Sequence, residues 1–304
     1  MKFFSSTNID FIRGRKITLL VSALLIAATV AAYIYRGGPN YGIDFTGGIS
    51  MQISFDKTVA LDDVRSSLDK ANIGSFDLQS SGQVVIIIAK QKMNDQHAFE
   101  AAVLNALTAK FPNNTLKVDG IEFVGPSVGA EIAKGSMKGF IGAFLLMILY
   151  IAFRFKSSVW GIAGVLGIIH DVIIVTGTVL IVNKEINITV IAGLLTVAGY
   201  SINDKIVLFD RMRENLRLSA KEDFATILNK SINQVILRTV VTSSTVFFVA
   251  ASLFFFGGEV LHTFAYIMLI GTMLGVYSSI FVCAPMIYEW ETRKRKRMKA
   301  AGIK

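Results

Sequence analysis

Four ionisable residues interrupt otherwise apolar segments of this 304-residue chain, and their side chains could carry charge chemistry. They are Asp171, Asp204, Lys205 and Arg238. An ionised side chain at membrane depth is costly, so such a residue is a functional-site hypothesis by default. A carboxyl group in low dielectric favours its protonated form, whereas a nearby arginine favours the ionised form. If an arginine approaches and withdraws, the carboxylate can therefore release and take up a proton.

Asp204 lies in the stretch 199–215 (GYSINDKIVLFDRMREN), whose polar residues recur at three- and four-residue steps. On a helix, that spacing places them on one face. The polar members of this face are Tyr200, Asn203, Asp204, Asp210, Arg211 and Glu214. Asn203 could hold the Asp204 carboxylate or a water molecule. Lys205 lies about 100° around the helix from Asp204, and we expect it to extend to the cytoplasmic surface.

Arg238 is the expected partner of Asp204. Both residues lie roughly 10 Å inside the membrane at 1.5 Å per helical residue, on sequential antiparallel helices. Asp171 lies about 20 Å from the cytoplasmic start of its helix, which makes it a second proton station. A fixed ion pair that only sets helix register is the alternative to a switchable proton site. His170 is expected either to be hydrogen-bonded inside the bundle or to relay protons beside Asp171.

Six apolar segments must position these charges. The chain is 53% hydrophobic and 17% charged, which is too apolar for an ordinary soluble domain. The first segment is either an uncleaved anchor, which its length favours, or a cleaved signal peptide. Basic residues at alternate segment ends predict that both termini are cytoplasmic. The net charge of +9 follows those ends, so we expect no nucleic-acid partner. The predicted spans are residues 17–35, 140–155, 159–182, 186–209, 235–256 and 263–288.

The only long hydrophilic region, residues 36–134, has the pattern of a small α+β domain. Its strands are predicted at 49–55, 73–78, 83–89 and 116–124, and its helices at 59–71 and 94–110. The order βαββαβ is typical of a ferredoxin-like domain. We therefore predict an α-helical polytopic membrane protein of six transmembrane helices, with an extracytoplasmic ferredoxin-like domain between helices 1 and 2. The predicted domains are 1–35 (cytoplasmic N-terminus and first helix), 36–134, 135–290 (helices 2–6) and 291–304 (basic cytoplasmic tail).

Two cytoplasmic segments carry further signals. Residues 219–222 (SAKE) have the spacing of a capping box. An apolar stripe follows them, so a short helix at the membrane interface is predicted before the fifth span. The basic tail is expected to face anionic lipid.

Several signatures of enzymes and metalloproteins do not occur in the sequence. It contains no Gly-x-x-x-x-Gly-Lys-[Ser/Thr] and no His-Glu-x-x-His. Its one cysteine, Cys283, cannot form a disulfide within the chain. We therefore predict that the protein is not an enzyme and has no catalytic residues, no metal site and no cofactor. A proton gradient is the expected energy source, and sodium stays open because Asn and Ser oxygens near a carboxylate could bind it.

Five short motifs follow one another along the chain at the predicted topological positions. They are Gly42, Asp44, Gly47 and Gly48 in GIDFTGG; Gly125, Pro126 and Gly129 in VGPSVG; His170 with Asp171; Gly199, Tyr200, Asn203 and Asp204, followed by Asp210 and Arg211; and Arg238 with Thr239, Thr242 and Ser243. This set resembles the SecD/SecF family of protein-export membrane proteins, within the resistance-nodulation-division superfamily of proton-driven transporters.

The resemblance implies an auxiliary subunit of the protein-export machinery in the bacterial inner membrane. Proton motive force would drive late steps of preprotein translocation, with Asp204 and Arg238 as the coupling pair. Implied partners are SecD, the SecYEG channel, YajC, unfolded preprotein and membrane lipids. Lys205 departs from the family pattern, which usually has a small hydroxyl residue there. Half of a small-molecule or lipid exporter and a non-transporting channel scaffold stay open as alternative functions.

Overall fold

The computed structural model describes residues 8–71, 73–90, 96–155, 158–219 and 221–300. Contacts divide the chain into two compact units. The helical unit comprises Met1–Asn40, Phe140–Lys184 and Thr189–Lys304, and the mixed unit comprises Tyr41–Gly139 and Glu185–Ile188. The domain boundaries given above remain predictions.

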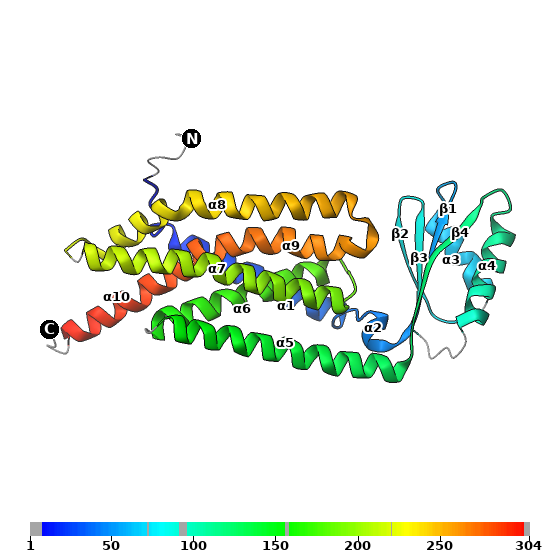
Figure 1. The fold of residues 1–304 in the computed structure, drawn as a ribbon, viewed down its shortest axis with the longest axis horizontal. Helices are drawn as coiled ribbons and strands as arrows, with labels where there is room; N and C mark the ends of the chain where they lie inside the picture. Colours follow the sequence, from blue (N-terminus) through cyan, green and yellow to red (C-terminus); the bar gives the residue numbers. More distant parts are fainter. Residues whose placement is uncertain (1–7, 72, 91–95, 156–157, 220, 301–304) are drawn as a thin grey trace. The chain divides into compact units, whose positions relative to one another are not determined.

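Long helices supply six candidate membrane spans within the described ranges. The first five are α1 (Arg15–Arg36), α5 (Pro126–Arg154), α6 (Ser158–Ile181), α7 (Ile188–Leu218) and α8 (Phe224–Phe256) (Figure 1). The sixth, Leu261–Met298, runs through α9 (Gly258–Ser278), a π-helical turn η1 (Ser279–Cys283) and α10 (Ala284–Ala300). Their lengths and apolar composition fit the predicted polytopic membrane protein.

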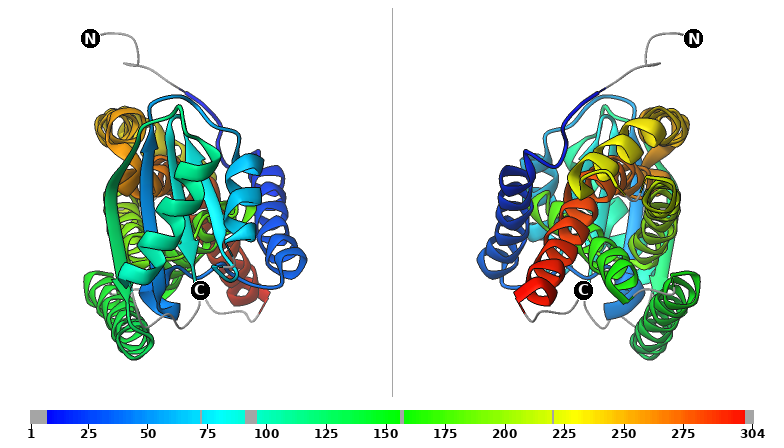
Figure 2. Two further views of the ribbon diagram at one scale, coloured as in Figure 1. Left: turned by 90° about the vertical axis from the view of Figure 1, so that its right-hand side faces the viewer. Right: turned by 90° about the vertical axis from the view of Figure 1, so that its left-hand side faces the viewer.

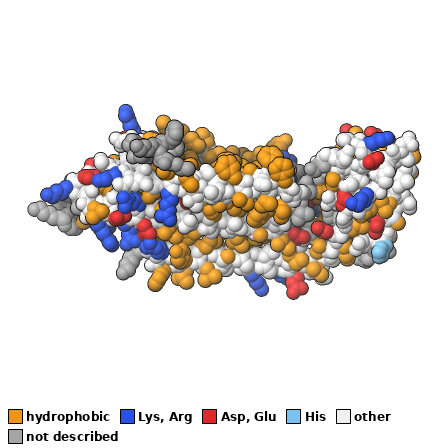
Figure 3. Space-filling model, turned by 45° about the horizontal axis from the view of Figure 1, so that its top comes forward, with side chains coloured by type: hydrophobic (Ala, Val, Ile, Leu, Met, Phe, Trp, Pro, Cys, Tyr) orange, Lys and Arg blue, Asp and Glu red, His pale blue; other side chains and the backbone are white. Residues whose placement is uncertain are grey.

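The centre of the helical unit is formed by α6, α7 and the last span, which bury about half or more of their apolar windows. Phe209 on α7 makes edge contacts with Phe155 and Trp160, at ring-centroid distances of 5.4 and 5.6 Å. By contrast, α1 and α5 leave most of their apolar side chains exposed. Hydrophobic side chains spread over the helices, and Lys and Arg gather at the end of this unit where the C-terminus lies (Figure 3). Such an apolar belt suits contact with lipid or with other membrane helices.

The mixed unit contains a four-stranded antiparallel sheet with two helices on one face (Figure 2). The strand order is β2-β3-β1-β4. Alternate residues of the strands point to the helices and bury an apolar core, as the two-residue period of a strand requires. The elements are β1 (Gly48–Phe55), α3 (Leu61–Lys70), β2 (Asp77–Ser81), β3 (Val84–Ala89), α4 (Gln96–Lys110) and β4 (Leu116–Val124). The predicted second helix began at residue 94, which lies outside the described residues.

Glycines of two motifs allow a close crossing between the short helix α2 (Ile43–Thr46) and the start of α5. Gly47 has a φ of 73°, and a Cβ there would lie 2.9 Å from Pro126 Cα. A Cβ on Gly129 would lie 2.8 Å from the Gly47 nitrogen. Asp44 accepts a hydrogen bond from the Ile188 N–H at 3.0 Å, where α7 begins. The motif residues Gly47, Asp44, Pro126 and Gly129 thus tie together segments of the mixed unit that are distant in sequence.

The expectation of a separate interfacial helix before the fifth span is wrong. Asp223, not Ser219, is the N-cap of α8, and its carboxylate accepts from the Ala225 N–H at 3.0 Å. The helix is then continuous from Phe224 to Phe256. Phe224 and Leu228 belong to the buried core of the helical unit, so this apolar stripe packs against protein. Ala220, within the expected capping box, lies outside the described residues.

Candidate functional site

The Asp171 carboxylate lies fully buried on α6 inside a closed network of hydrogen bonds. Its Oδ2 accepts from Lys205 Nζ at 3.0 Å, from Ser201 Oγ at 2.5 Å and from Ser278 Oγ at 2.7 Å. Its Oδ1 lies 2.9 Å from His170 Nδ1. Residues from α6, α7 and α9 therefore meet at one carboxylate, whose oxygens are well supplied with donors.

Lys205 does not extend to the cytoplasmic surface, and that expectation is wrong. The side chain is 1% exposed, and Nζ donates to Ser201 Oγ at 2.5 Å and to Ser278 Oγ at 2.8 Å as well as to Asp171. Gly167, one turn before Asp171 on α6, leaves the space for the lysine stem. A Cβ on Gly167 would lie only 2.4 Å from Lys205 Cε. The Asp171 carboxylate and the two serine hydroxyls compensate the charge of the buried ammonium and accept its hydrogen bonds.

His170 lies inside the helical unit, as expected for an imidazole that is hydrogen-bonded within the bundle. Its ring stacks on Tyr277 of α9, with centroids 6.3 Å apart. The Tyr277 hydroxyl donates to the Thr18 carbonyl at 2.8 Å and lies 3.1 Å from Ser22 Oγ of α1. His170 Nε2 has no hydrogen-bond partner among the described residues. The imidazole thus connects the Asp171 network to α9 and α1, and its role as a relay stays a hypothesis.

Asp204 is buried but far less well satisfied than Asp171. It is 4% exposed, and its hydrogen-bond partner within the described ranges is Ser243 Oγ of α8, at 3.4 Å. That hydroxyl also accepts from the Tyr200 hydroxyl at 3.0 Å. Asn203 is exposed, and within the described part of the chain its side chain makes no hydrogen bond to Asp204. The two buried acids of the helical unit therefore differ: Asp171 is locked, and Asp204 is loosely held.

Arg238 lies on an exposed face of α8, and the described residues contain no ion pair between it and Asp204. Thr242 and Thr245, at the next turns of α8, are exposed as well. On α7, Gly199 and Asn203 are exposed in the same way. The four polar residues among them, Asn203, Arg238, Thr242 and Thr245, are called here the polar face. The hydroxyls of Thr242 and Thr245 donate to backbone carbonyls of α8 at 2.8 and 2.7 Å, whereas the side chains of Asn203 and Arg238 make no hydrogen bond among the described residues. Those two side chains are poorly matched to lipid, because polar groups in hydrocarbon need partners. The coupling role of Asp204 with Arg238 stays a prediction.

The charged end of α7 serves to join helices. Asp210 forms an ion pair with Arg154 of α5. Arg211 Nε donates to Gln234 Oε1 of α8 at 2.7 Å, and Asn215 Nδ2 donates to the same oxygen at 2.7 Å. The motif residues Asp210 and Arg211 thus fix the packing at the C-terminal end of α7 and do not contact either buried acid.

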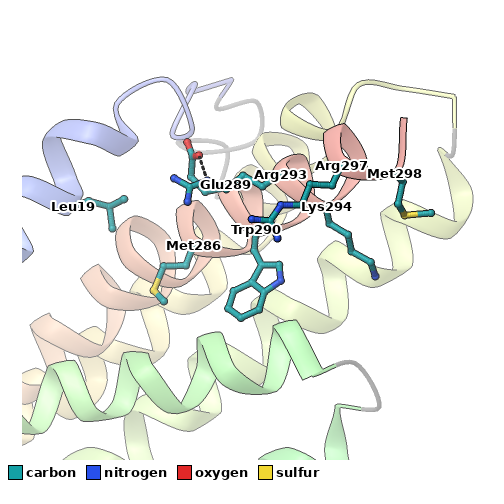
Figure 4. Close-up of a pocket in the computed structure, with 8 residues that line it drawn as sticks. All are labelled: Leu19, Met286, Glu289, Trp290, Arg293, Lys294, Arg297 and Met298. Carbon is teal, nitrogen blue, oxygen red and sulfur yellow. Dashed lines mark ion pairs between the residues drawn. The ribbon is translucent and has the colours of Figure 1, made fainter. Parts of the chain in front are cut away.

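A second feature is a pocket of about 580 Å³ between α1 and α10 (Figure 4). Trp290 lies beside three basic side chains there, and Arg293 pairs with Glu289 at 3.8 Å. Glu289 also pairs with Arg15 at 2.7 Å. The pocket is lined by Leu19, Met286, Glu289, Trp290, Arg293, Lys294, Arg297 and Met298. An aromatic ring beside several cations is a suitable surface for an anionic headgroup.

Comparison with known proteins gives concordant matches. A family model described as "Protein export membrane protein SecD/SecF, C-terminal" matches residues 103–293, and one described as "SecD/SecF GG Motif" matches residues 37–59. The chain is 58% identical over 301 residues to the protein translocase subunit SecF of Endomicrobium trichonymphae, covering 99% of this chain and 97% of that protein. It is 40% identical over 294 residues to the SecF subunit of Thermodesulfovibrio yellowstonii, covering 94% and 96%.

A solved structure is also similar. It is the crystal structure of SecDF from Thermus thermophilus, titled a translocon-associated membrane protein, with a TM-score of 0.86 and 32% identity. The match covers 96% of this chain but only 40% of that longer chain. This chain is therefore similar to one part, about two fifths, of a longer membrane-protein chain.

Proposed function

We propose that this chain, which belongs to the SecD/SecF family of protein-export membrane proteins, couples proton movement across the bacterial inner membrane to late steps of preprotein translocation. The observation that carries the proposal is the state of Asp204. A buried carboxylate with one long hydrogen bond, at 3.4 Å, is poised to change its protonation when a charge nearby moves. The proposal needs no cofactor, and a sodium gradient is the competing energy source.

The contrast between the two buried acids supports Asp204 as the proton carrier. Asp171 already has an ammonium at 3.0 Å and two hydroxyl donors, so its charge is compensated inside the chain. Asp204 has no cation within hydrogen-bond distance among the described residues, although Lys205 follows it in sequence. Exchange of a proton therefore needs less rearrangement at Asp204 than at Asp171.

The polar face supports a partner subunit in the membrane. Arg238, Thr242 and Asn203 are exposed in the isolated chain, and a partner's helices would shield them from lipid. SecD is the proposed partner, because the similar solved chain is titled SecDF and is more than twice as long as the region matched. Approach of Arg238 to Asp204 would then accompany movement of α8 against the partner. Association with SecYEG and YajC is part of the same proposal.

The mixed unit is proposed to be a ferredoxin-like domain on the outer side of the membrane. Its strand order β2-β3-β1-β4 and its two helices on one face support that classification. The basic residues of α10 and of the α7 end support cytoplasmic termini. We propose that this domain contacts unfolded preprotein as it emerges, and that movement of the helices is transmitted to it through the segment that begins α5.

Membrane lipids are proposed to bind the pocket between α1 and α10. Its cations would contact an anionic headgroup, and the Trp290 ring would lie at the level of the membrane interface. A double substitution, Arg293→Gln with Arg297→Gln, should weaken binding of anionic but not of neutral lipid to the purified chain. Equal binding of both lipids by the unchanged protein would contradict this part of the proposal.

The experiment that tests the function is Asp204→Asn, which keeps the shape of the side chain and removes its charge. Preprotein export should lose its dependence on proton motive force, while insertion and association with SecD persist. Asp210→Asn is the matched control, because Asp210 is a carboxylate on the same helix that pairs with Arg154 outside the buried site. Normal proton-dependent export by the Asp204→Asn variant would refute the proposal. Lost assembly with unchanged export per assembled complex would favour the scaffold function.

A further inference from the structure

Three oxygens surround the ammonium of Lys205 deep inside the helical unit. Nζ lies 3.0 Å from Asp171 Oδ2, 2.5 Å from Ser201 Oγ and 2.8 Å from Ser278 Oγ. All four residues are almost wholly buried, the most exposed of them being 1% accessible. A lysine ammonium has three N–H donors, so each proton has one acceptor and none is left over.

The two hydroxyls act in both directions. Ser201 and Ser278 accept from Lys205, and each donates its own proton to Asp171 Oδ2. They therefore connect the cation and the carboxylate as well as lining the space between them. One carboxylate and two hydroxyl oxygens from α6, α7 and α9 form an oxygen-lined site around a single positive charge, which is the kind of donor set that hard cations prefer.

We propose that Asp171, Ser201 and Ser278 form a monovalent-cation site that is filled by the chain's own tethered cation, the Lys205 ammonium. In the unchanged protein the tether excludes a free ion such as Na⁺ from this site. Removal of the ammonium leaves a buried carboxylate with two hydroxyls directed at it and with room for water. That carboxylate then recruits a free small cation, because an uncompensated buried charge is strongly unfavourable.

The packing around the stem supports a site whose shape depends on Lys205. Gly167 has no side chain where the lysine passes, since a Cβ there would lie 2.4 Å from Cε and 2.4 Å from Cys283 Sγ. Shortening Lys205 to alanine therefore leaves a narrow space, as long as the three deleted methylene groups, that ends at the oxygens of Asp171, Ser201 and Ser278. Ion binding at these three oxygens is independent of the proposed role in export.

The alternative is that the Asp171–Lys205 ion pair serves only to fix the register of α6 against α7, and its expected result is different. If the pair only pins α6 to α7, the Asp171 carboxyl in a Lys205→Ala variant takes up a proton and sodium makes no difference. If the tethered-cation proposal holds, sodium stabilises that variant. A free n-propylammonium ion, which has the length of the deleted stem, should stabilise it as well.

The test compares thermal unfolding of purified Lys205→Ala in NaCl and in choline chloride at equal ionic strength and pH. The expected result is a Tm of Lys205→Ala that is about 4 °C or more higher in NaCl than in choline chloride. This is the shift expected when the sodium concentration is some tens of times the Kd of the site. The unchanged protein should show no difference between the two salts. Asp171→Asn combined with Lys205→Ala should also show none, because the carboxylate is gone while the cavity remains.

Folding of the variant is itself informative. Recovery of monodisperse Lys205→Ala protein in sodium or n-propylammonium but not in choline supports the proposal. Equal Tm values and equal recovery in sodium and choline, including no recovery in either, overturn it. Sodium stabilisation that persists in the Asp171→Asn, Lys205→Ala double variant also overturns it, because the ion then binds elsewhere.

Discussion

The Asp171–Lys205 pair should contribute substantially to the stability of the helical unit, and Lys205→Met tests this directly. Methionine keeps the volume and the unbranched shape of the stem but lacks the ammonium. Breaking one side of a buried pair costs about 3–5 kcal/mol. Asp171 keeps His170 and the hydroxyls of Ser201 and Ser278 as partners, so we expect about 3 kcal/mol. At about 2–4 °C per kcal/mol, Tm should fall by roughly 6–12 °C.

The assay is thermal unfolding in detergent without sodium, followed by tryptophan fluorescence. Trp160 is a suitable reporter because it is buried in the same helical unit. The control is Asp171→Asn combined with Lys205→Met, which removes both charges and should recover at least half of the loss. A loss below about 1 kcal/mol in the single variant, or additive losses in the double variant, would refute this account of the pair.

Three further changes test other parts of the structure. Gly167→Ala should cost about 1–3 kcal/mol through overlap with Lys205 and Cys283; Gly142→Ala, where a Cβ meets nothing within 4 Å, is the control and should cost nothing. Asp44→Ala should cost about 1 kcal/mol and speed hydrogen exchange of the Ile188 amide, whereas Asp44→Asn keeps an acceptor; unchanged exchange in Asp44→Ala would argue against this cap. Burial raises the pKa of Glu185, and Lys90 at 2.9 Å lowers it in part. Near this pKa the folded chain binds more protons than the unfolded chain, so the stability that Glu185 contributes is full below pH 4.5 and is lost as the pH rises above it. In Glu185→Gln, the free energy of unfolding should therefore fall less with rising pH than in the unchanged protein. The same pH profile in both proteins would contradict this account.

The sequence could predict the helices and strands because their hydrophobic periods are strong. The six apolar runs correspond to the six candidate spans among the described residues, and the order of strands and helices in residues 48–124 follows from alternation and turn residues. The start of α8 could not be placed, because Ser219 and Asp223 both have good capping chemistry. The structure places the N-cap at Asp223, whose carboxylate accepts from the Ala225 N–H.

The four buried or membrane-depth charges could be found from the sequence, but not their pairing. Depth along the helices suggested Asp204 with Arg238, whereas the rotation of α7 directs Lys205 to Asp171. Ser278 was missed because α9 contributes it from more than one hundred residues away. Two features of the sequence could have indicated the Asp171–Lys205 contact. Ser201 lies one turn before Lys205, and Gly167 lies one turn before Asp171. Small residues at such steps permit close packing around a neighbouring side chain.

The central claim is that protonation of Asp204 couples a proton gradient to export. The most direct measurement is preprotein export in inverted membrane vesicles that contain the partner subunits, with a proton gradient and a sodium gradient imposed separately. We predict that the proton gradient alone stimulates export, and that Asp204→Asn abolishes this stimulation while the Asp210→Asn control keeps it. Equal stimulation by a sodium gradient, or full proton-driven stimulation in Asp204→Asn vesicles, would contradict the claim.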